Sequence, residues 1–494
     1  MFSISKLLND RPGRVLAIVC LLQALLWTLV PALTHRAPPL DVVESYLWGR
    51  EWVWATFKHP SFPGWSLEAS RILTGQTGWP AYVLSQIVVV VTYVAVFRLG
   101  RDLFGRDAAG ERLALGGVLL LTALYYMSLT TPEWNHNVPQ IALYSLLIWA
   151  VWRATTLDSL IAWLWVGALG GLGLHVKYSF GILLVVAALW IVIDRRGRHL
   201  LRPGPWLGLL LFLVIASPQA LWLVANDFRP FTYAQARAGG ATTGNALDFL
   251  LAQIADHLLV FVLAAVAGLI ARPRPRLATL PAIDRRLAFL LTFGLGPVFM
   301  AILLALVTGS GLKDMWGMPM FSLSGLLIVA LAGERLTAPR LRRLTIGALI
   351  VVIALPLAYG TFIALDGRAA KKPQRVQWPM AAIAAQGARG WSQATPAPLK
   401  VVAGDVWVAG LVALNHPDHP SILTDGDMDL SPWVTPARLE RQGALAVWQE
   451  TGEGPPPKLA ALIGTAPRRS AVIPWPGYPD RPPLVLGYAA LPPR

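Results

Sequence analysis

The sequence has little of two things that soluble proteins use freely, cysteine and charge. Its 494 residues include a single cysteine, Cys20, which lies in an apolar run, so no disulfide can form within the chain. Only 14% of the residues are charged, whereas 55% are hydrophobic. Such a long chain with so few charges is too apolar to be one soluble domain. The composition therefore indicates a protein that lies in a membrane.

Long apolar segments recur along the chain as far as Leu365. A helix needs about 20 such residues to cross a bilayer core, and the alternating pattern of an outer-membrane barrel is absent. We predict a polytopic α-helical membrane protein with about 11 transmembrane helices. The predicted spans are Val15–Leu33, Trp79–Phe97, Leu113–Leu129, one ending at Trp152, Ser159–Leu174, one ending at Ile193, Trp206–Ala225, one ending before Arg272, Leu287–Val307, one ending near Gly333, and Leu344–Leu365.

The basic residues are distributed as membrane topology requires. They give a formal net charge of +15, but they form no separate basic domain of the kind that binds nucleic acid. With the N-terminus in the cytoplasm, every arginine cluster falls on the cytoplasmic side, and an odd number of spans sends the C-terminus to the periplasm. The first run could also be a signal peptide, but no small-residue cleavage site ends it. The clusters are Lys6 to Arg14, Arg98 to Arg112, Arg153, Arg195 to Arg202, Arg272 to Arg286 and Arg335 to Arg343.

The pattern changes after Leu365, where Pro, Gly, Asp and Trp become frequent and apolar runs shorten to strand length. We predict a transmembrane domain over 1–365, with a catalytic first periplasmic loop at 34–78, and a small periplasmic α/β domain over 366–494. The segment Asp425–Asp429 (DGDMD) lacks the later Gly and terminal Glu of an EF-hand loop, so we predict no metal site. The predicted strands include Leu399–Ala403, Ala444–Trp448 and Leu484–Ala489.

Ionisable residues gather in the loops that this topology places on the outer face. Because such groups are costly at membrane depth, they indicate a functional site. A lysine that extends to the interface or a tryptophan of an aromatic belt is the simpler explanation for any one of them. Five loops that bring acids, bases and cations to one face favour a site. The residues are Asp41, Glu44, Lys58 and His59; Glu133, Asn135, His136 and Asn137; Lys177 and Tyr178; Asn226, Asp227 and Arg229; and Lys313, Asp314 and Trp316.

These residue types fit the transfer of a group to a hydroxyl. A carboxylate takes the proton of the acceptor as the new bond forms, and cations neutralise a phosphate leaving group. Either Asp41 or Glu44 is the candidate base. A lipid-linked donor explains why such chemistry is built on helices within a bilayer. The candidates for binding the phosphate are Lys58, His59, Lys177 and Lys313.

The spacing in these loops resembles a known family. The first loop carries Asp41-Val42-Val43-Glu44, then Trp48-Gly49-Arg50-Glu51-Trp52, then Lys58-His59-Pro60. It resembles the first outer loop of the polyprenol-phosphate-dependent glycosyltransferases of the GT-C superfamily. These include protein O-mannosyltransferases, lipid A aminoarabinose transferases and lipopolysaccharide-core galacturonosyltransferases. Weaker matches, at Glu133–Asn137, Lys177-Tyr178 and Lys313–Pro319, extend the resemblance over Asp41–Pro319.

The resemblance implies inverting transfer of one sugar from an undecaprenyl-type phosphate carrier to a hydroxyl of lipid A, lipopolysaccharide core or another envelope glycan. The expected location is the periplasmic face of a bacterial inner membrane, and the expected partners are the polyprenyl-phosphate donor, the lipid or glycan acceptor and membrane lipids, without nucleic acid. The implied roles are catalysis for Asp41 and Glu44; donor-phosphate binding for Lys58, His59, Lys177, Tyr178 and Lys313; and substrate binding for Glu133, Asn135, His136, Asn137 and Trp316.

The sequence departs from the family pattern in two places. The family commonly places the two acids of the first loop side by side, whereas Val42 and Val43 separate them here. The base therefore stays open between them, and we favour Asp41 because it stands first after the helix. Asn135 and Asn137 stand where relatives often carry another acid, so we predict neither a metal nor a cofactor.

Two further expectations concern the loops and the alternatives. The loop Asn226–Gln253, which contains Gly239-Gly240 and Thr242-Thr243-Gly244, is expected to be mobile and to close over the donor. A transporter or flippase for a lipid-linked sugar is the main alternative, and an inactive scaffold subunit is another. Transporters commonly show inverted repeats and polar paths, but here no repeat is visible and the polar groups gather at one face.

Overall fold

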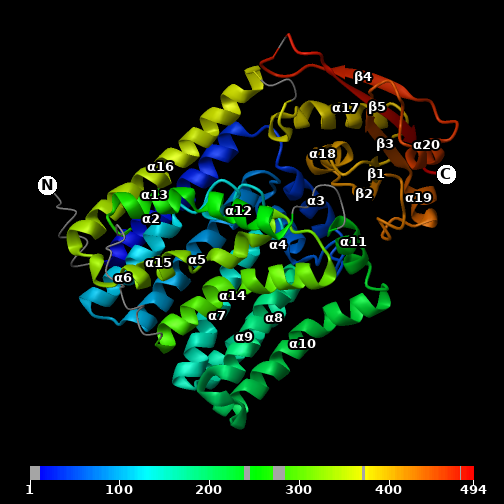
Figure 1. Cartoon of the computed structure of the whole chain (residues 1–494). Coiled ribbons are helices and arrows are strands. Elements are labelled where there is room, and N and C mark those ends of the chain that lie inside the picture. Colours follow the sequence, from blue (N-terminus) through cyan, green and yellow to red (C-terminus); the bar gives the residue numbers. More distant parts are fainter. Residues whose placement is uncertain (1–11, 239–244, 271–283, 370–372, 479) are drawn as a thin grey trace.

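The computed structural model describes residues 12–238, 245–270, 284–369, 373–478 and 480–494. It consists of a body of long helices with a small sheet domain packed against one end (Figure 1). The helices of the body are α2 (Pro12–Thr34), α3 (Leu40–Gly49), α4 (Phe62–Thr74), α5 (Trp79–Phe104), α6 (Ala108–Leu121), η1 (Tyr125–Met127), α7 (Val138–Leu157), α8 (Leu160–Val176), η2 (Tyr178–Phe180), α9 (Gly181–Ile193), η3 (Asp194–Leu201), α10 (Pro203–Ala225), α11 (Arg229–Ala238), α12 (Ala246–Asp256), α13 (Leu258–Val266), α14 (Arg285–Thr308), η4 (Asp314–Phe321), α15 (Ser324–Ala332), η5 (Gly333–Arg335) and α16 (Ala338–Ala369).

The helical membrane fold predicted from the sequence is confirmed. Among the described residues, seven helices are long and apolar enough to cross a bilayer, or eight if the bent pair of η4 and α15 counts as one span. Each of the eleven predicted spans contains a helix, but those that form α6, α7 and α8 do not meet this measure. The lipid-facing role is clearest on α10, where Leu213, Leu221 and Val224 each expose more than half of their surface.

The predicted third span, Leu113–Leu129, is too long, because α6 ends at Leu121 and a 3-10 turn follows. The turn carries Tyr126 into the interior. There its hydroxyl lies 2.9 Å from the backbone oxygen of Asp314 and 3.0 Å from Oε1 of Gln253. A regular helix would keep this side chain on its own surface, so the tertiary contact ends the helix early.

Glycines allow the helices of the body to approach closely. A Cβ atom on Gly167 of α8 would lie 2.0 Å from the backbone oxygen of Gly208 on α10. Without such a side chain the two backbones pack directly, as is common where helices associate in membranes. The α8 backbone is equally close at Gly208, where a Cβ would lie 2.5 Å from the backbone oxygen of Trp163.

The C-terminal domain is a five-stranded mixed sheet with the order β2-β1-β3-β5-β4. β1 is parallel to β2 and β3, whereas β5 is antiparallel to β3 and β4. Strands were predicted at β1, β3 and β5, and all three form. The elements are η6 (Arg375–Gln377), α17 (Met380–Ser392), β1 (Val401–Gly404), α18 (Val408–Asn415), β2 (Ser421–Thr424), α19 (Pro436–Gln442), β3 (Ala444–Gln449), α20 (Pro457–Ile463), β4 (Arg469–Ile473) and β5 (Leu484–Leu491).

This domain packs directly on the first loop of the body. Helix α18 lies against α3, where a Cβ on Gly410 would come within 2.5 Å of Val43 Cγ1. The backbone amides of Arg36 and Ala37 both donate to the carbonyl oxygen of Val376, at 2.7 and 3.1 Å. The first loop is therefore held between the membrane helices and the sheet domain.

The predicted loop Asn226–Gln253 is largely helical, which corrects the expectation of an irregular segment. It forms α11 and most of α12, and its Gly239-Gly240 and Thr242–Gly244 segments lie outside the described residues. The side chain of Asn245 accepts hydrogen bonds from the amides of Leu247 and Asp248 and so caps α12. A capping box favours helix here despite the glycine and threonine residues upstream.

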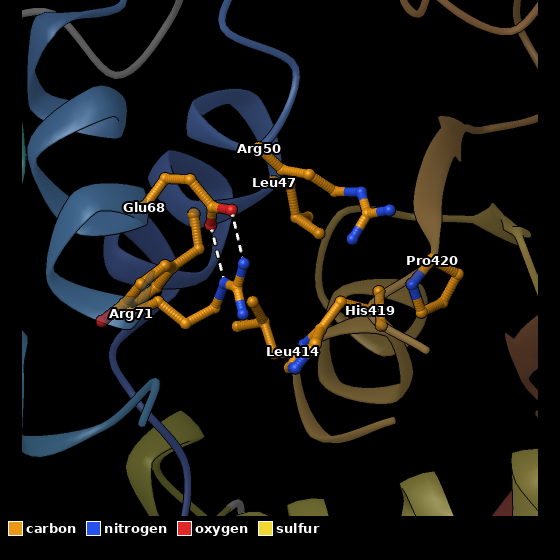
Figure 2. A pocket seen from close by; sticks show the side chains of 9 residues that line it. Leu47, Arg50, Glu68, Arg71, Leu414, His419 and Pro420 are labelled. Carbon is orange, nitrogen blue, oxygen red and sulfur yellow. Dashed lines mark hydrogen bonds and ion pairs between the residues drawn. The ribbon is translucent and has the colours of Figure 1, made fainter. Parts of the chain in front are cut away.

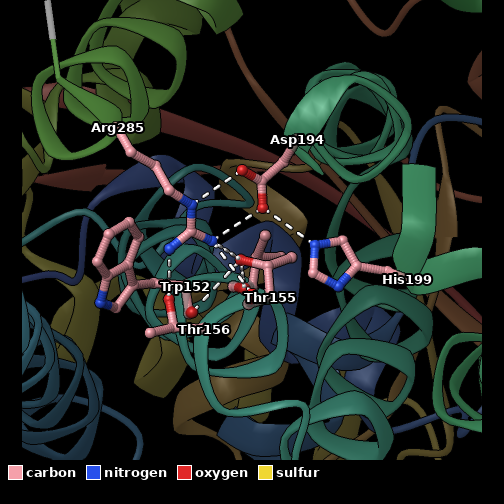
Figure 3. Close-up of polar contacts among 7 residues, drawn as sticks. Trp152, Thr155, Thr156, Asp194, His199 and Arg285 are labelled. Carbon is pink, nitrogen blue, oxygen red and sulfur yellow. Dashed lines mark hydrogen bonds and ion pairs between the residues drawn. The ribbon is translucent and has the colours of Figure 1, made fainter. Parts of the chain in front are cut away.

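A polar network joins three elements at the opposite end of α7 from the sheet domain (Figure 3). Arg285 at the start of α14 donates to both oxygens of Asp194, from Nε at 2.9 Å and from Nη2 at 2.8 Å. His199 Nε2 lies 3.0 Å from the same carboxylate, and the Arg285 guanidinium lies 4.7 Å from the ring of Trp152. This bidentate pair ties the ends of α7, η3 and α14 together.

Candidate functional site

The first loop folds into two helices that pack without side chains between them. A Cβ on Gly49, the last residue of α3, would lie only 2.0 Å from the backbone oxygen of Gly64 on α4. Asp41 lies in the first turn of α3, where the helix dipole stabilises a carboxylate. Glu44 follows three residues later, and this spacing places both acids on one face of the helix. The valines that separate them in the sequence, Val42 and Val43, are buried.

The two acids have different surroundings. Lys58 Nζ donates to Glu44 Oε2 at 2.7 Å, and the side chains are 21% and 12% exposed. Burial raises the pKa of Glu44, and the charge of Lys58 partly opposes this. Burial lowers the pKa of Lys58, but the Glu44 carboxylate outweighs it, so the net pKa is raised. Glu44 and Lys58 therefore form an ion pair in which each side chain neutralises the charge of the other.

Asp41, by contrast, is half-buried and accepts a hydrogen bond from no described residue. Its charge nevertheless acts on groups from three loops. It adds to burial in raising the pKa of Glu133 to about 7, and it opposes the lowering of the pKa of Lys177. It also contributes to the raised pKa values of Glu44 and Lys58. The Asp41 carboxylate thus lies amid the predicted site residues with its oxygens available.

The second loop fastens the first one in place. Asn135 Oδ1 accepts a hydrogen bond from the amide of Asn137 at 2.8 Å, and Asn137 Oδ1 accepts from Lys177 Nζ. His136 Nε2 lies 3.0 Å from the carbonyl oxygen of Pro60, and Trp134 Nε1 donates to that of Pro63 at 2.9 Å. Three of the five residues that were predicted to bind substrate are buried in these contacts, namely Asn135, His136 and Asn137.

Two neighbouring histidines, His59 and His136, have imidazole rings whose neutral form is favoured. The rings of His59 and His136 lie 4.2 Å apart, beside the indole of Trp48. Burial lowers the pKa of His136 to about 3 and that of His59 well below its usual range, with Lys58 and Lys177 acting in the same direction. The lowered pKa favours the neutral form of His59, so its predicted contact with the donor phosphate would be a hydrogen bond, and that contact stays a prediction.

Lys177 lies just beyond the end of α8. Burial lowers the pKa of its ammonium group to about 8, the Asp41 carboxylate opposes this, and Lys58 adds to it. Tyr178 is less available, because its hydroxyl accepts a hydrogen bond from Gln219 at 2.6 Å and its ring stacks on Phe231. Tyr178 thereby links η2 to α10 and α11.

The fifth loop brings a further cation. Burial lowers the pKa of Lys313, and the charge of Arg237 on α11 adds to the effect, as does that of Lys58. Lys313 therefore lies near both the first loop and α11. Trp316 is partly buried against the hydrophobic core, so it supports this loop from within.

Helix α11 contributes residues that the sequence analysis missed. Tyr233 lies with its ring 5.9 Å from Lys58 Nζ and 5.7 Å from the ring of Phe57. A signal was present, since Arg229, Tyr233 and Arg237 follow at intervals of four and so share one helix face. The Gly, Ala and Thr content of the segment Asn226–Gln253 predicted a loop in place of this helix. Arg375 of the C-terminal domain was also missed, and its charge lowers the pKa of Glu133.

Comparisons with known proteins agree with this architecture. The family described as dolichyl-phosphate-mannose-protein mannosyltransferase matches residues 58–222. The chain is 26% identical to the lipopolysaccharide core galacturonosyltransferase RgtA of Rhizobium johnstonii, over 88% of this chain and 86% of that protein. It is 27% identical to RgtB of the same organism, over 91% of each chain.

Solved structures show the same fold. ArnT from Cupriavidus metallidurans, crystallised with undecaprenyl phosphate, superposes with a TM-score of 0.63 at 16% identity, over 97% of this chain and 98% of that chain. Its apo form gives a TM-score of 0.60, also at 16% identity, over 95% and 97% of the two chains. The matched family, the two relatives and the shared fold together support a glycosyltransferase of the GT-C superfamily. The resemblance found in its loops is thereby confirmed, and the transferase is a multi-span membrane protein.

Proposed function

We propose that the transferase moves a single sugar from a polyprenyl-phosphate donor to a hydroxyl group of an envelope lipid or glycan. The observation that carries this proposal is the pairing of one available carboxylate with several ammonium groups in a single site. Asp41 has no hydrogen-bonding partner among the described residues, and its charge acts on both Lys58 and Lys177. An available base beside clustered cations is the arrangement that transfer from a phosphate to a hydroxyl requires.

The proposed step is a single displacement. The acceptor oxygen attacks the anomeric carbon on the face opposite the phosphate, while Asp41 takes the hydroxyl proton. The bond between the anomeric carbon and the phosphate oxygen breaks, and both electrons leave with the polyprenyl phosphate. Lys58, Lys177 and Lys313 neutralise the charge that develops on it. The attack from the opposite face inverts the anomeric configuration, and the proton on Asp41 is lost to solvent before the next turnover.

The choice between the two acids rests on their partners. Glu44 is engaged with Lys58 at 2.7 Å, so its charge serves to hold that lysine. A base that has to release its ion-pair partner before taking a proton is at a disadvantage. The free carboxylate of Asp41 supports it as the base, with Glu44 as the residue that positions Lys58.

The names of the relatives support the donor and acceptor classes. RgtA and RgtB are lipopolysaccharide core galacturonosyltransferases, and ArnT, which has a similar fold, was crystallised with undecaprenyl phosphate. We accordingly propose a lipopolysaccharide-type acceptor, an undecaprenyl-type carrier and a site on the periplasmic face of the bacterial inner membrane. Residues 1–365 would form the transmembrane domain with its catalytic loop at 34–78, and residues 366–494 the periplasmic domain.

The test is transfer of label from radiolabelled polyprenyl-phosphate sugars to deep-core lipopolysaccharide, by wild type and by Asp41→Asn and Glu44→Gln variants. Asp41→Asn is expected to lower turnover by roughly 10²- to 10⁴-fold, the usual contribution of a positioned base. It should shift the unfolding temperature only slightly, since no described hydrogen bond is lost and the helix-dipole contribution of a carboxylate is about 1 kcal/mol or less. Glu44→Gln should keep more turnover than Asp41→Asn. Near-normal turnover by Asp41→Asn would refute the assignment, and a reversed order would identify Glu44 as the base.

A further inference from the structure

A small cavity lies where the first loop meets the C-terminal domain. One wall comes from α3 and α4, with Arg50, Glu68 and Arg71, and the other comes from the connection between α18 and β2, with His419 and Pro420. Figure 2 shows the two guanidinium groups and the imidazole around the same space. The cavity volume of about 10 Å³ admits one oxygen atom of the size of water, so a larger group would rest on its rim.

Arg50 and Arg71 differ in whether their guanidinium donors already have acceptors. Arg71 is held by Glu68 through two hydrogen bonds, from Nε at 2.9 Å and from Nη2 at 2.7 Å. No described residue accepts a hydrogen bond from the side chain of Arg50, whose Nε lies 3.8 Å from Oε1 of Glu51. A half-buried guanidinium with open donors is suited to a bidentate oxyanion.

The charges around the cavity leave it positive. Among the residues that line it, Arg50 and Arg71 face one carboxylate, Glu68, so one positive charge remains when His419 is neutral. Burial lowers the pKa of Arg50, and Arg71 and Arg438 act in the same direction. Burial also lowers the pKa of His419, with Arg71 and Arg50 adding to it. An anion in the cavity would relieve this repulsion between like charges.

The backbone beside the cavity is also unusual. His419 has a φ of +43°, in the left-handed region that non-glycine residues seldom adopt. The connection between α18 and β2 is held in this form with the His419 side chain turned into the cavity (Figure 2). Strained residues of this kind cluster at ligand-binding positions.

We propose that this cavity binds an oxyanion of the acceptor, a phosphate ester or a carboxylate, through Arg50. The inference rests on the proposed transfer to an anionic glycolipid. Arg50 caps the C-terminal end of α3, and Asp41 lies in its first turn. An offset of nine residues is a rise of about 14 Å along the helix and about two and a half turns around it, so the two side chains leave α3 on opposite sides. An acceptor anchored at Arg50 would therefore have to pass around one side of α3 to reach Asp41, which requires an extended saccharide. The C-terminal domain would supply one wall of the anchor.

The experiment measures binding of radiolabelled deep-core lipopolysaccharide to the full-length protein in lipid nanodiscs without donor. Three acceptor samples are compared: untreated, treated with phosphatase, and amidated at its carboxylates. The variants are Arg50→Gln and Arg50→Lys, with Arg389→Gln as a matched control, because Arg389 is exposed on α17 and bonds only within that helix among the described residues.

Arg50→Gln is expected to weaken binding of the untreated acceptor at least tenfold, and Arg389→Gln to leave it unchanged. Arg50→Lys should fall between, since lysine keeps the charge but loses the fork of donors. One of the two treatments should weaken binding to the wild type as much as Arg50→Gln does and leave that variant unaffected. The treatment that does so identifies a phosphate or a carboxylate.

Two results would overturn the proposal. One is binding of the untreated acceptor by Arg50→Gln at wild-type affinity. The other is a loss in Arg50→Gln that persists unchanged with both treated acceptors, which would mark a packing role. Sugar transfer by the wild type is measured in parallel and reports on the proposed function separately. Arg50-dependent binding without any transfer would support the anion site and refute the proposed reaction.

Discussion

The ammonium group of Lys177 should set an alkaline limit on donor binding. Its pKa is about 8, because burial disfavours the charged form. Relative to an ordinary lysine at 10.5, this is a loss of roughly 3 kcal/mol in the stability of the charged form. The charged form dominates below pH 8 and disappears above it. On the proposal that the donor phosphate contacts the charged form of Lys177, kcat/KM for the donor should fall about tenfold for each pH unit above 8.

The perturbation that tests this is Lys177→Arg. Arginine stays charged throughout the range, so the variant should lose the alkaline fall even if its activity at pH 7.5 is lower. Lys458→Arg is the matched control, because Lys458 pairs with Asp427 on the surface of the C-terminal domain. That variant should keep the wild-type profile.

The assay is initial-rate transfer from a labelled polyprenyl-phosphate sugar between pH 7.5 and 9.5, with the unfolding temperature recorded at each pH. Lys313 has a lowered pKa too and is a candidate for the same phosphate, so Lys313→Arg is measured in parallel to separate its titration. The other neighbours of Lys177 do not obscure the window. His59 and His136 are neutral throughout because their pKa values are lowered, and Glu133 titrates near pH 7. Lys58 stays charged because its pKa is raised. If kcat/KM of Lys177→Arg for the donor fell above pH 8 as steeply as that of the wild type, the assignment of the alkaline limit to Lys177 would be refuted.

Two further predictions concern how the site is held. Glu44→Gln and Lys58→Met should each destabilise the protein by about 1–3 kcal/mol, which is less than for a fully buried pair because both side chains keep some exposure. In a double-mutant cycle measured by denaturation, the double variant should recover most of this loss. Strictly additive losses would show that the pair is not coupled. Gly410→Val should lower both the unfolding temperature and the rate of transfer, because its Cβ would lie 2.5 Å from Val43 Cγ1, whereas Gly78→Ala, which meets nothing within 4 Å, should change neither. Full activity in Gly410→Val would show that the contact between α18 and α3 does not matter to the site.

Much of the fold could be predicted because the signals are local. Long apolar runs mark helices wherever they occur, and strand-length runs bounded by Gly, Pro and Asp mark β1, β3 and β5. The errors occurred where a distant residue decided the local structure. α6 stops early because Tyr126 reaches Gln253 and the Asp314 backbone, which lie far away in the sequence. α11 was missed because glycine and threonine residues nearby resemble a loop.

The candidate site shows the same division. The separation of Asp41 and Glu44 looked like a departure from the family pattern, but on a helix a spacing of three places both on one face. The sequence does not say which of them binds Lys58, and the 2.7 Å contact with Glu44 comes from a turn that folds back on α3. That contact is what separates the proposed roles of the two acids.

The sequence by itself determined the class of this protein and the residues that carry its polar chemistry. Apolar length, arginine placement and the acids of the first loop are encoded in neighbouring residues, and each has a physical meaning without the rest of the chain. The tertiary structure alone decided the charge states of these groups and their neighbours. Burial makes His59 and His136 neutral and lowers the pKa of Lys177, and α18 seats the C-terminal domain on α3 beside Arg50. Such effects depend on which segments pack together, because desolvation and Coulomb interactions act across space and not along the chain.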